Sequence, residues 1–171
     1  MIIRSSTLSD VSVIMRIIKD AQTHLAQQKI DQWQNGYPSL EIINNDIIKG
    51  NSYVIIDTKE ETIATTMFTI QPEPTYTKIE GQWLRPVNEK YGVIHRLAIK
   101  ASKRNQGIAK AIFKHFESVL INNSIPSMKV DTHRGNLGMQ HMLKSIGYTY
   151  CGIIYLEDGN ERFGFEKILE Q

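Results

Sequence analysis

The chain of 171 residues contains a single cysteine, Cys151, and therefore cannot form an intrachain disulfide. This excludes a cystine-stapled secreted domain and indicates a reducing, cytoplasmic environment. No stretch approaches the roughly 18 consecutive apolar residues of a membrane-spanning helix. The first residues, 1–5, lack the basic and then apolar pattern of a secretory signal peptide. These absences predict a cytoplasmic protein that does not associate with membranes.

Excess charge of either sign is also missing. The 20 lysines and arginines against 18 aspartates and glutamates give a net charge of +2. Nucleic-acid-binding domains usually carry a strong basic excess, so no nucleic-acid partner is expected. The five histidines show no metal-ligand spacing such as HExxH, and one cysteine offers no paired thiolates, so no metal site is expected. The length predicts one domain over residues 1–171.

Hydrophobic periodicity predicts a mixed α/β fold. Thr7 with Asp10 forms a capping box before the first helix, and Ser39 is an N-cap for the second. A helix between two buried strands, over residues 93–131, calls for a parallel pair with a right-handed crossover, and hairpins on both sides make the sheet mixed. Strands are predicted over 2–4, 53–57, 62–70, 93–99, 128–131, 148–156 and 162–168, and helices over 8–25, 40–49, 107–122 and 136–146. The proline-containing segment 71–90 shows no period and is predicted to be a long functional loop.

Residues 91–110 carry the strongest chemical signal, because a buried strand leads through a basic turn into a helix at Gly107. A helix start offers unpaired amides and partial positive charge, and a glycine lets an anion approach those amides closely. Between residues 90 and 116 there is no acidic residue. The basic residues there are Lys90, Arg96, Lys100, Lys103, Arg104, Lys110 and Lys114. This concentration of charge suits a polyanionic small molecule better than a long duplex.

The same stretch resembles the GNAT superfamily of acetyl-CoA-dependent acetyltransferases. That family's signature is Arg or Gln, two residues, Gly, one residue, then Gly or Ala, and this chain has Arg104-Asn105-Gln106-Gly107-Ile108-Ala109. The segment from Asn136 to Gly147-Tyr148 is similar to the family's Asn…Gly-Phe helix. The resemblance implies a GNAT fold of the α/β (α+β) class, with a mixed central sheet of about seven strands, about four flanking helices, and splayed parallel strands fourth and fifth in order.

The resemblance also implies acetyl-CoA as co-substrate. The backbone of the strand end at Leu97 to Ile99 would pair with the pantetheine arm, amides of the turn and helix start would hold the pyrophosphate, and Asn136 would bond the pantetheine or adenosine side. The implied cofactor-binding residues are Leu97, Ala98, Ile99, Arg104, Asn105, Gln106, Gly107, Ile108, Ala109, Lys110 and Asn136. Acetyl transfer would be direct attack by an acceptor amine on the thioester, without an acyl-enzyme.

The general acid cannot be transferred from the family pattern. The family often places a tyrosine four residues before the glycine of the second segment, as general acid for the departing thiolate. Here that position is Leu143, while Tyr148 stands at the usual Phe position and is retained as a catalytic candidate.

Two histidines are candidate bases. His95 lies two residues before Leu97 on the strand, so alternation predicts that both share a face. It could take a proton from an ammonium acceptor, or it could be a half-buried structural histidine. Asp131 and His133 lie on one side of the next strand end, where a carboxylate orienting an imidazole would form a base. Alternatively, both cap the turn and helix that follow.

Trp33 and Tyr37 lie in the polar segment 31–38 and are costly to expose, so they line the acceptor site or pack. What the resemblance implies is an acetyltransferase acting on a small amine, a peptide N-terminus or a lysine. The alternatives are a non-catalytic acyl-CoA-binding sensor on the same fold and a basic nucleic-acid module at residues 90–116. A homodimer is left open.

Overall fold

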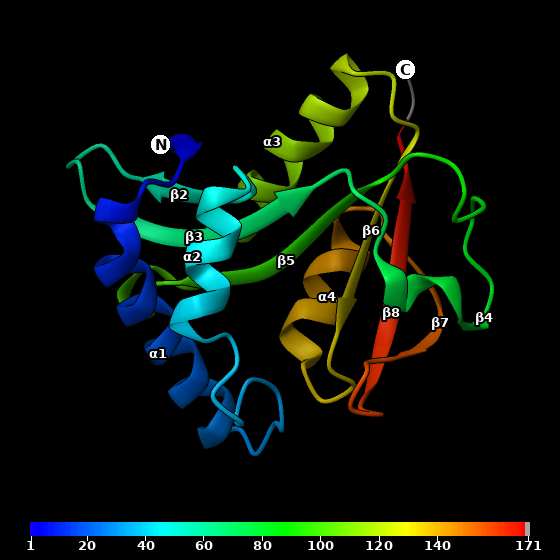
Figure 1. The fold of residues 1–171 in the computed structure, drawn as a ribbon, viewed down its shortest axis with the longest axis horizontal. Coiled ribbons are helices and arrows are strands. Elements are labelled where there is room, and N and C mark those ends of the chain that lie inside the picture. The colour runs from blue at the N-terminus through cyan, green and yellow to red at the C-terminus, as the bar shows by residue number, and fades with distance from the viewer. Residues whose placement is uncertain (170–171) are drawn as a thin grey trace. The chain divides into compact units, whose positions relative to one another are not determined.

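The computed structural model describes residues 1–169. Within them the helices are α1 (Val11–Gln27), α2 (Leu40–Ile48), α3 (Ile108–Asn122) and α4 (Leu137–Ser145). The strands are β1 (Ile2–Ser5), β2 (Ser52–Ile56), β3 (Thr62–Thr69), β4 (Glu80–Gly81), β5 (Gly92–Ile99), β6 (Ser127–Thr132), β7 (Thr149–Tyr155) and β8 (Glu161–Ile168). They form an 8-stranded mixed sheet in the order β1-β2-β3-β5-β6-β8-β7-β4 (Figure 1).

The mixed α/β class predicted from the sequence is confirmed. β5 and β6 form the expected parallel pair, with Gly92 opposite Met128 and Val93 opposite Lys129. The strand count differs because β4 lies inside the segment that was predicted to be a loop, where it pairs antiparallel with β7. A strand of two residues has no period, so the pattern of the sequence could not reveal it. None of the helices in residues 1–169 has both the length and the apolar character needed to cross a bilayer.

The chain forms two compact units, each built from two separate stretches of sequence. The first unit combines Met1–Phe68 with His95–Ile112. The second unit combines Thr69–Ile94 with the described residues from Phe113 onward. The strand β5 and the helix α3 each contribute residues to both units.

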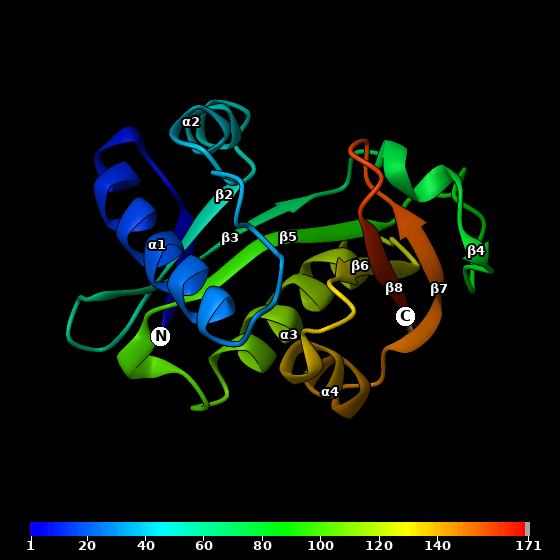
Figure 2. The same cartoon turned by 90° about the horizontal axis from the view of Figure 1, so that it is seen from below.

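The core of the first unit lies between its two helices and its strands. Figure 2 shows α1 and α2 side by side over β2. The buried cluster consists of Ile14, Ile17, Ile18, Ile43, Val54 and Ala98. The predicted caps are present, since Asp10 accepts from the Thr7 amide at 2.8 Å and Ser39 accepts from the Ile42 amide at 3.3 Å. The first helix starts later than predicted because residues 8–10 form a 3₁₀ turn.

In the second unit the segment 71–90 folds back onto the sheet instead of projecting as a loop. Tyr76 belongs to a 3₁₀ turn and is fully buried, and Trp83 and Tyr91 pack with it. The Trp83 indole donates to the Tyr76 carbonyl at 2.9 Å, which satisfies the polar atom of a buried ring. Cys151 is buried in the same cluster. The segment is therefore held by its aromatic side chains.

A fully buried ion pair also holds this segment. The side chains of Lys129 on β6 and Glu166 on β8 are both 0% exposed, and their charged atoms are 2.5 Å apart. Glu166 accepts from the amides of Leu84 and Arg85 at 2.7 and 3.2 Å, and Lys129 donates to the Arg85 carbonyl at 3.1 Å. Burial lowers the pKa of Lys129, although Glu166 opposes that shift. The pair thus connects the sheet to the backbone of the segment.

We expect Glu166→Gln to lower the free energy of unfolding by about 3–5 kcal/mol, because it leaves the Lys129 ammonium buried without a counter-charge. The matched control is Glu161→Gln on the same strand, whose ion pair with Arg134 is exposed and should contribute about 0–1 kcal/mol. Urea unfolding curves measure both values. Similar small losses in the two variants would contradict a stabilising role for the buried pair.

Candidate functional site

The turn between β5 and α3 lies within the first unit. After the strand ends at Ile99, residues 101–103 form a 3₁₀ turn and the chain reverses through two left-handed residues, Asn105 at φ +60° and Gly107 at φ +77°. A Cβ placed on Gly107 would meet no atom within 4 Å. The glycine is therefore required by its backbone conformation, and the space in front of it is open.

The start of α3 is suited to an anion. The Ala111 amide donates to the Gly107 carbonyl at 3.1 Å, which is the first bond of the helix. Helix geometry leaves the amides of Ile108, Ala109 and Lys110 without an acceptor inside the helix. These amides and the helix dipole together attract a phosphate or a similar group. The residues at this position therefore fit a pyrophosphate.

The basic residues of the stretch 90–116 are less available to bind an anionic ligand than the sequence suggested. The prediction of a concentrated positive patch is corrected, because acidic residues from other segments neutralise part of it. The ion pairs are Arg96 with Asp46, Lys100 with Glu61, and Lys103 with Asp57. The hydrogen bond from Lys103 holds the pKa of Asp57 at about 2. Arg104 donates to the Asp20 carbonyl at 3.1 Å and carries its charge beside the turn.

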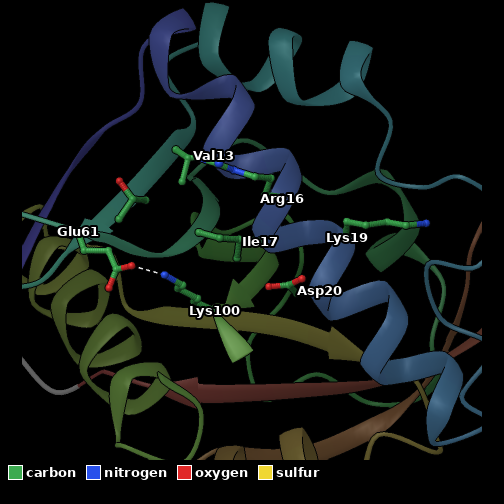
Figure 3. Close-up of a pocket in the computed structure, with 8 residues that line it drawn as sticks. Val13, Arg16, Ile17, Lys19, Asp20, Glu61 and Lys100 are labelled. Atoms are coloured by element: carbon green, nitrogen blue, oxygen red, sulfur yellow. Dashed lines mark hydrogen bonds and ion pairs between the residues drawn. The ribbon is translucent and has the colours of Figure 1, made fainter. Parts of the chain in front are cut away.

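A groove of about 630 Å³ lies between α1 and the region where β3 begins and β5 ends. Figure 3 shows the Lys100 ammonium directed at Glu61, while the Lys19 side chain extends away from that pair. The wall also includes Asp20 and the apolar side chains of Val13 and Ile17. Because the groove carries charges of both signs and its Lys100 is paired with Glu61, it is less suited to a polyanion than the start of α3.

The strand that carries His95 is not regular. Arg96 has φ +53°, a left-handed conformation inside β5. The prediction that His95 shares a face with Leu97 assumed strict alternation, and a left-handed residue between them breaks that alternation. His95 is half-buried, and its carbonyl accepts from the Thr66 hydroxyl on β3 at 3.2 Å. The alternation that predicted a shared face for His95 and Leu97 is therefore interrupted between them. His95 itself belongs to the first unit.

In the second unit Asp131 and His133 each make a hydrogen bond to a residue outside the pair. The Tyr76 hydroxyl donates to Asp131 at 2.8 Å. The Gly135 amide donates to Nδ1 of His133 at 2.9 Å. Since Nδ1 accepts this bond, it carries no proton to donate to Asp131. His133 thus caps the turn, as the second alternative of the sequence analysis supposed for both residues, whereas Asp131 accepts from Tyr76.

Tyr148 and Asn136 belong to the packing and capping of the second unit. The Tyr148 ring is buried and meets Phe113 edge to face at 5.4 Å between centroids. Burial, followed by the nearby Glu117 carboxylate, raises the pKa of Tyr148 well above its ordinary value. A buried phenol of this kind is a poor proton donor, so we do not retain it as a general acid. Asn136 accepts from the Met139 amide at 3.2 Å as the N-cap of α4.

The two aromatic residues of the α1–α2 loop (residues 28–39) differ in exposure. Trp33 packs partly buried against the core of the first unit, whereas Tyr37 is 40% exposed and accepts from Arg96 at 2.7 Å. Asp46, the acidic partner of Arg96, was not singled out in the sequence. The available signal was a carboxylate three residues after Ile43, on the apolar face of the predicted helix.

No three His, Cys, Asp or Glu side chains gather into a metal-binding group within residues 1–169. The model of the acetyltransferase (GNAT) family matches residues 18–148, which is more than half of the chain. No curated protein matches the sequence.

Solved structures of acetyltransferases are similar to the chain over nearly its whole length. An acetyltransferase of the GNAT family from Streptococcus agalactiae is 32% identical, with a TM-score of 0.89 over 99% of this chain and 96% of that one. A GNAT-family acetyltransferase from Listeria monocytogenes is 17% identical, with a TM-score of 0.77 over 98% and 94%. A ribosomal-protein-alanine N-acetyltransferase from Brucella melitensis is 15% identical, with a TM-score of 0.69 over 99% and 100%. The last two likenesses concern the fold alone.

Proposed function

Because this chain belongs to the GNAT acetyltransferase family, we propose that it moves an acetyl group from acetyl-CoA to an amine acceptor by direct attack in a ternary complex. The observation that carries this proposal is the start of α3, where open space in front of Gly107 adjoins the amides of the first helical turn. A pyrophosphate needs that combination, because its oxygens must approach backbone N–H groups closely.

In this proposal the turn and helix start hold the diphosphate of acetyl-CoA. The amides from Asn105 to Lys110 donate to its oxygens, and Arg104 adds a full positive charge. The Gln106 side chain donates to the Ser102 carbonyl at 3.1 Å, which ties the turn to itself. A turn held in this way loses little conformational freedom when the ligand binds.

The pantetheine arm would lie along the end of β5. The described pairs between β5 and β6 are at Gly92 and Val93, at the start of β5. Backbone groups of Leu97, Ala98 and Ile99, at the other end of the strand, would pair with an extended ligand, as an added strand would. This supports placing the thioester near the carboxyl half of β5.

We assign proton removal from the acceptor to His95. An amine is mostly ammonium at neutral pH and cannot attack a thioester until it loses a proton. His95 belongs to the same unit as the proposed pantetheine site at Leu97 to Ile99, and it is half-buried. His133 is the weaker candidate because its Nδ1 already accepts from Gly135.

Acetyl-CoA at about 100 times its dissociation constant should stabilise the protein by ~2.7 kcal/mol, read as a rise in melting temperature.

Gly107→Asn should weaken acetyl-CoA binding about 10- to 100-fold, because a side chain then occupies the space in front of the amides. Asparagine tolerates left-handed backbone better than other non-glycine residues, so folding should survive. Calorimetric titration with acetyl-CoA measures the affinity.

The matched control for that change is Gly50→Asn. Gly50 is also left-handed, at φ +72°, and a Cβ there also meets nothing within 4 Å. Unchanged acetyl-CoA affinity in Gly107→Asn would place the diphosphate elsewhere. Tight binding without release of free thiol in the presence of any amine would favour the acyl-CoA sensor over the enzyme.

His95→Gln should lower kcat about 10²- to 10⁴-fold while leaving acetyl-CoA affinity nearly intact, because glutamine keeps a polar side chain but cannot take a proton. The acidic limb of the pH–rate profile should change as well. Rates measured by thiol release for His95→Gln and His133→Gln separate the two candidate bases. A large loss in His133→Gln with none in His95→Gln would reverse the assignment.

A further inference from the structure

The strand β5 contains a strained residue that the proposed chemistry does not explain. Arg96 is left-handed, at φ +53°, and this conformation is unfavourable for a non-glycine residue. Such strain persists only where the surrounding contacts hold it. The contacts of the Arg96 side chain identify what holds it here.

The Arg96 guanidinium makes a two-pronged ion pair with Asp46 of α2. Nε donates to Oδ2 and Nη2 donates to Oδ1, both at 2.8 Å. The two side chains are only 12% and 10% exposed. Parallel charge-assisted bonds of this kind fix direction as well as distance, so the pair sets the orientation of the guanidinium.

The third nitrogen of the guanidinium reaches the α1–α2 loop. Nη1 donates to the Tyr37 hydroxyl at 2.7 Å. The Tyr37 carbonyl accepts from Gln22 of α1 at 2.9 Å, and Gln34 donates to the Gln22 carbonyl at 3.1 Å. Tyr37 is therefore fixed at its main chain by α1 and at its hydroxyl by Arg96.

This arrangement determines what the Tyr37 hydroxyl can do. A lone pair of its oxygen is occupied by a cationic donor, and no side chain or backbone group within residues 1–169 accepts its proton. The residue is 40% exposed, so the O–H can reach a ligand. A hydroxyl that already accepts from a cation is also a stronger donor. Because the cationic Arg96 already donates to it, the hydroxyl is better suited to a ligand oxygen than to a second ammonium group.

We propose that the Tyr37 hydroxyl donates to a carbonyl or carboxylate oxygen next to the amine of the acceptor, and that Arg96 and Asp46 are positioning residues for it. The inference rests on the proposed acetyl transfer and narrows its acceptor. The favoured class is an amine with an adjacent carbonyl, such as an amino-acid amide or a peptide N-terminus. Simple alkylamines and polyamines lack the oxygen that this donor requires.

A matched pair of acceptors tests the inference. Alaninamide and isopropylamine differ by the carboxamide beside the amine, and acetyl-CoA-dependent thiol release gives kcat and KM for each. We expect the wild-type protein to prefer alaninamide. Tyr37→Phe should lower kcat/KM for alaninamide about tenfold, mainly through KM, and leave isopropylamine unchanged. The control is Tyr155→Phe on β7, which removes a hydroxyl from a residue of similar exposure, 41% against 40%, and should leave kcat and KM for both acceptors unchanged.

Arg96→Lys keeps the positive charge but loses the two-pronged geometry. It should reproduce the loss seen in Tyr37→Phe, and the double variant should lose no more than either single one. Additive losses would show that Arg96 does not act through Tyr37 and would overturn the positioning role. Equal losses for both acceptors in Tyr37→Phe would show a structural effect and would overturn the donor role.

The outcomes also separate this inference from the proposed function. Turnover of isopropylamine or of spermidine without a preference for alaninamide would overturn the inference while acetyl transfer stands. If no amine gives thiol release although acetyl-CoA raises the melting temperature, both the proposed enzymatic function and the proposed acceptor class are overturned. The non-catalytic acyl-CoA-binding sensor then remains as the function.

Discussion

The ion pair between Arg96 and Asp46 is the contact on which the first unit depends for its shape at β5. The left-handed conformation of Arg96 is strained, and the two parallel hydrogen bonds to the buried carboxylate of Asp46 offset that strain. The left-handed Arg96 interrupts regular alternation after His95, and the Thr66 hydroxyl donates to the His95 carbonyl. The Arg96 side chain thereby connects β5 to α2 through Asp46 and to the α1–α2 loop through Tyr37.

In the second unit a buried ion pair also fixes the position of neighbouring residues, but there it holds a backbone segment instead of a side chain. Lys129 and Glu166 are both on strands, and their spare hydrogen-bonding capacity goes to the backbone of Leu84 and Arg85. The pair thus orders a segment that has little regular structure of its own. Both units show the same principle: a buried charge is tolerated where its partner and all its donors are satisfied, and the satisfied group then specifies one arrangement of the chain around it.

Periodicity predicted most of the fold because helices and long strands have repeating apolar faces, as at residues 11–27 and 62–69. The turn before α3 was also readable, since a glycine at a helix start has few other uses. What the sequence could not reveal depends on contacts between distant residues. Nothing local predicts that Asp46 lies against Arg96, or that Asp57 and Glu61 neutralise lysines some 40 positions later. The strict alternation assumed for β5 is interrupted for the same reason, because the left-handed Arg96 is held by a partner 50 residues away.

The division of labour between backbone and side chains follows from these pairings. Arg96, Lys100 and Lys103 of the stretch 90–116 form ion pairs with carboxylates. The proposed anion site at the start of α3 therefore relies chiefly on backbone amides, which carry no net charge and so cannot be neutralised by an ion pair. Side-chain charge is used instead to position groups, as Arg96 positions Tyr37. In the proposed function, a site built in this way would recognise the diphosphate of acetyl-CoA through the backbone, while the choice of acceptor would rest on the few side chains that the ion pairs hold in place.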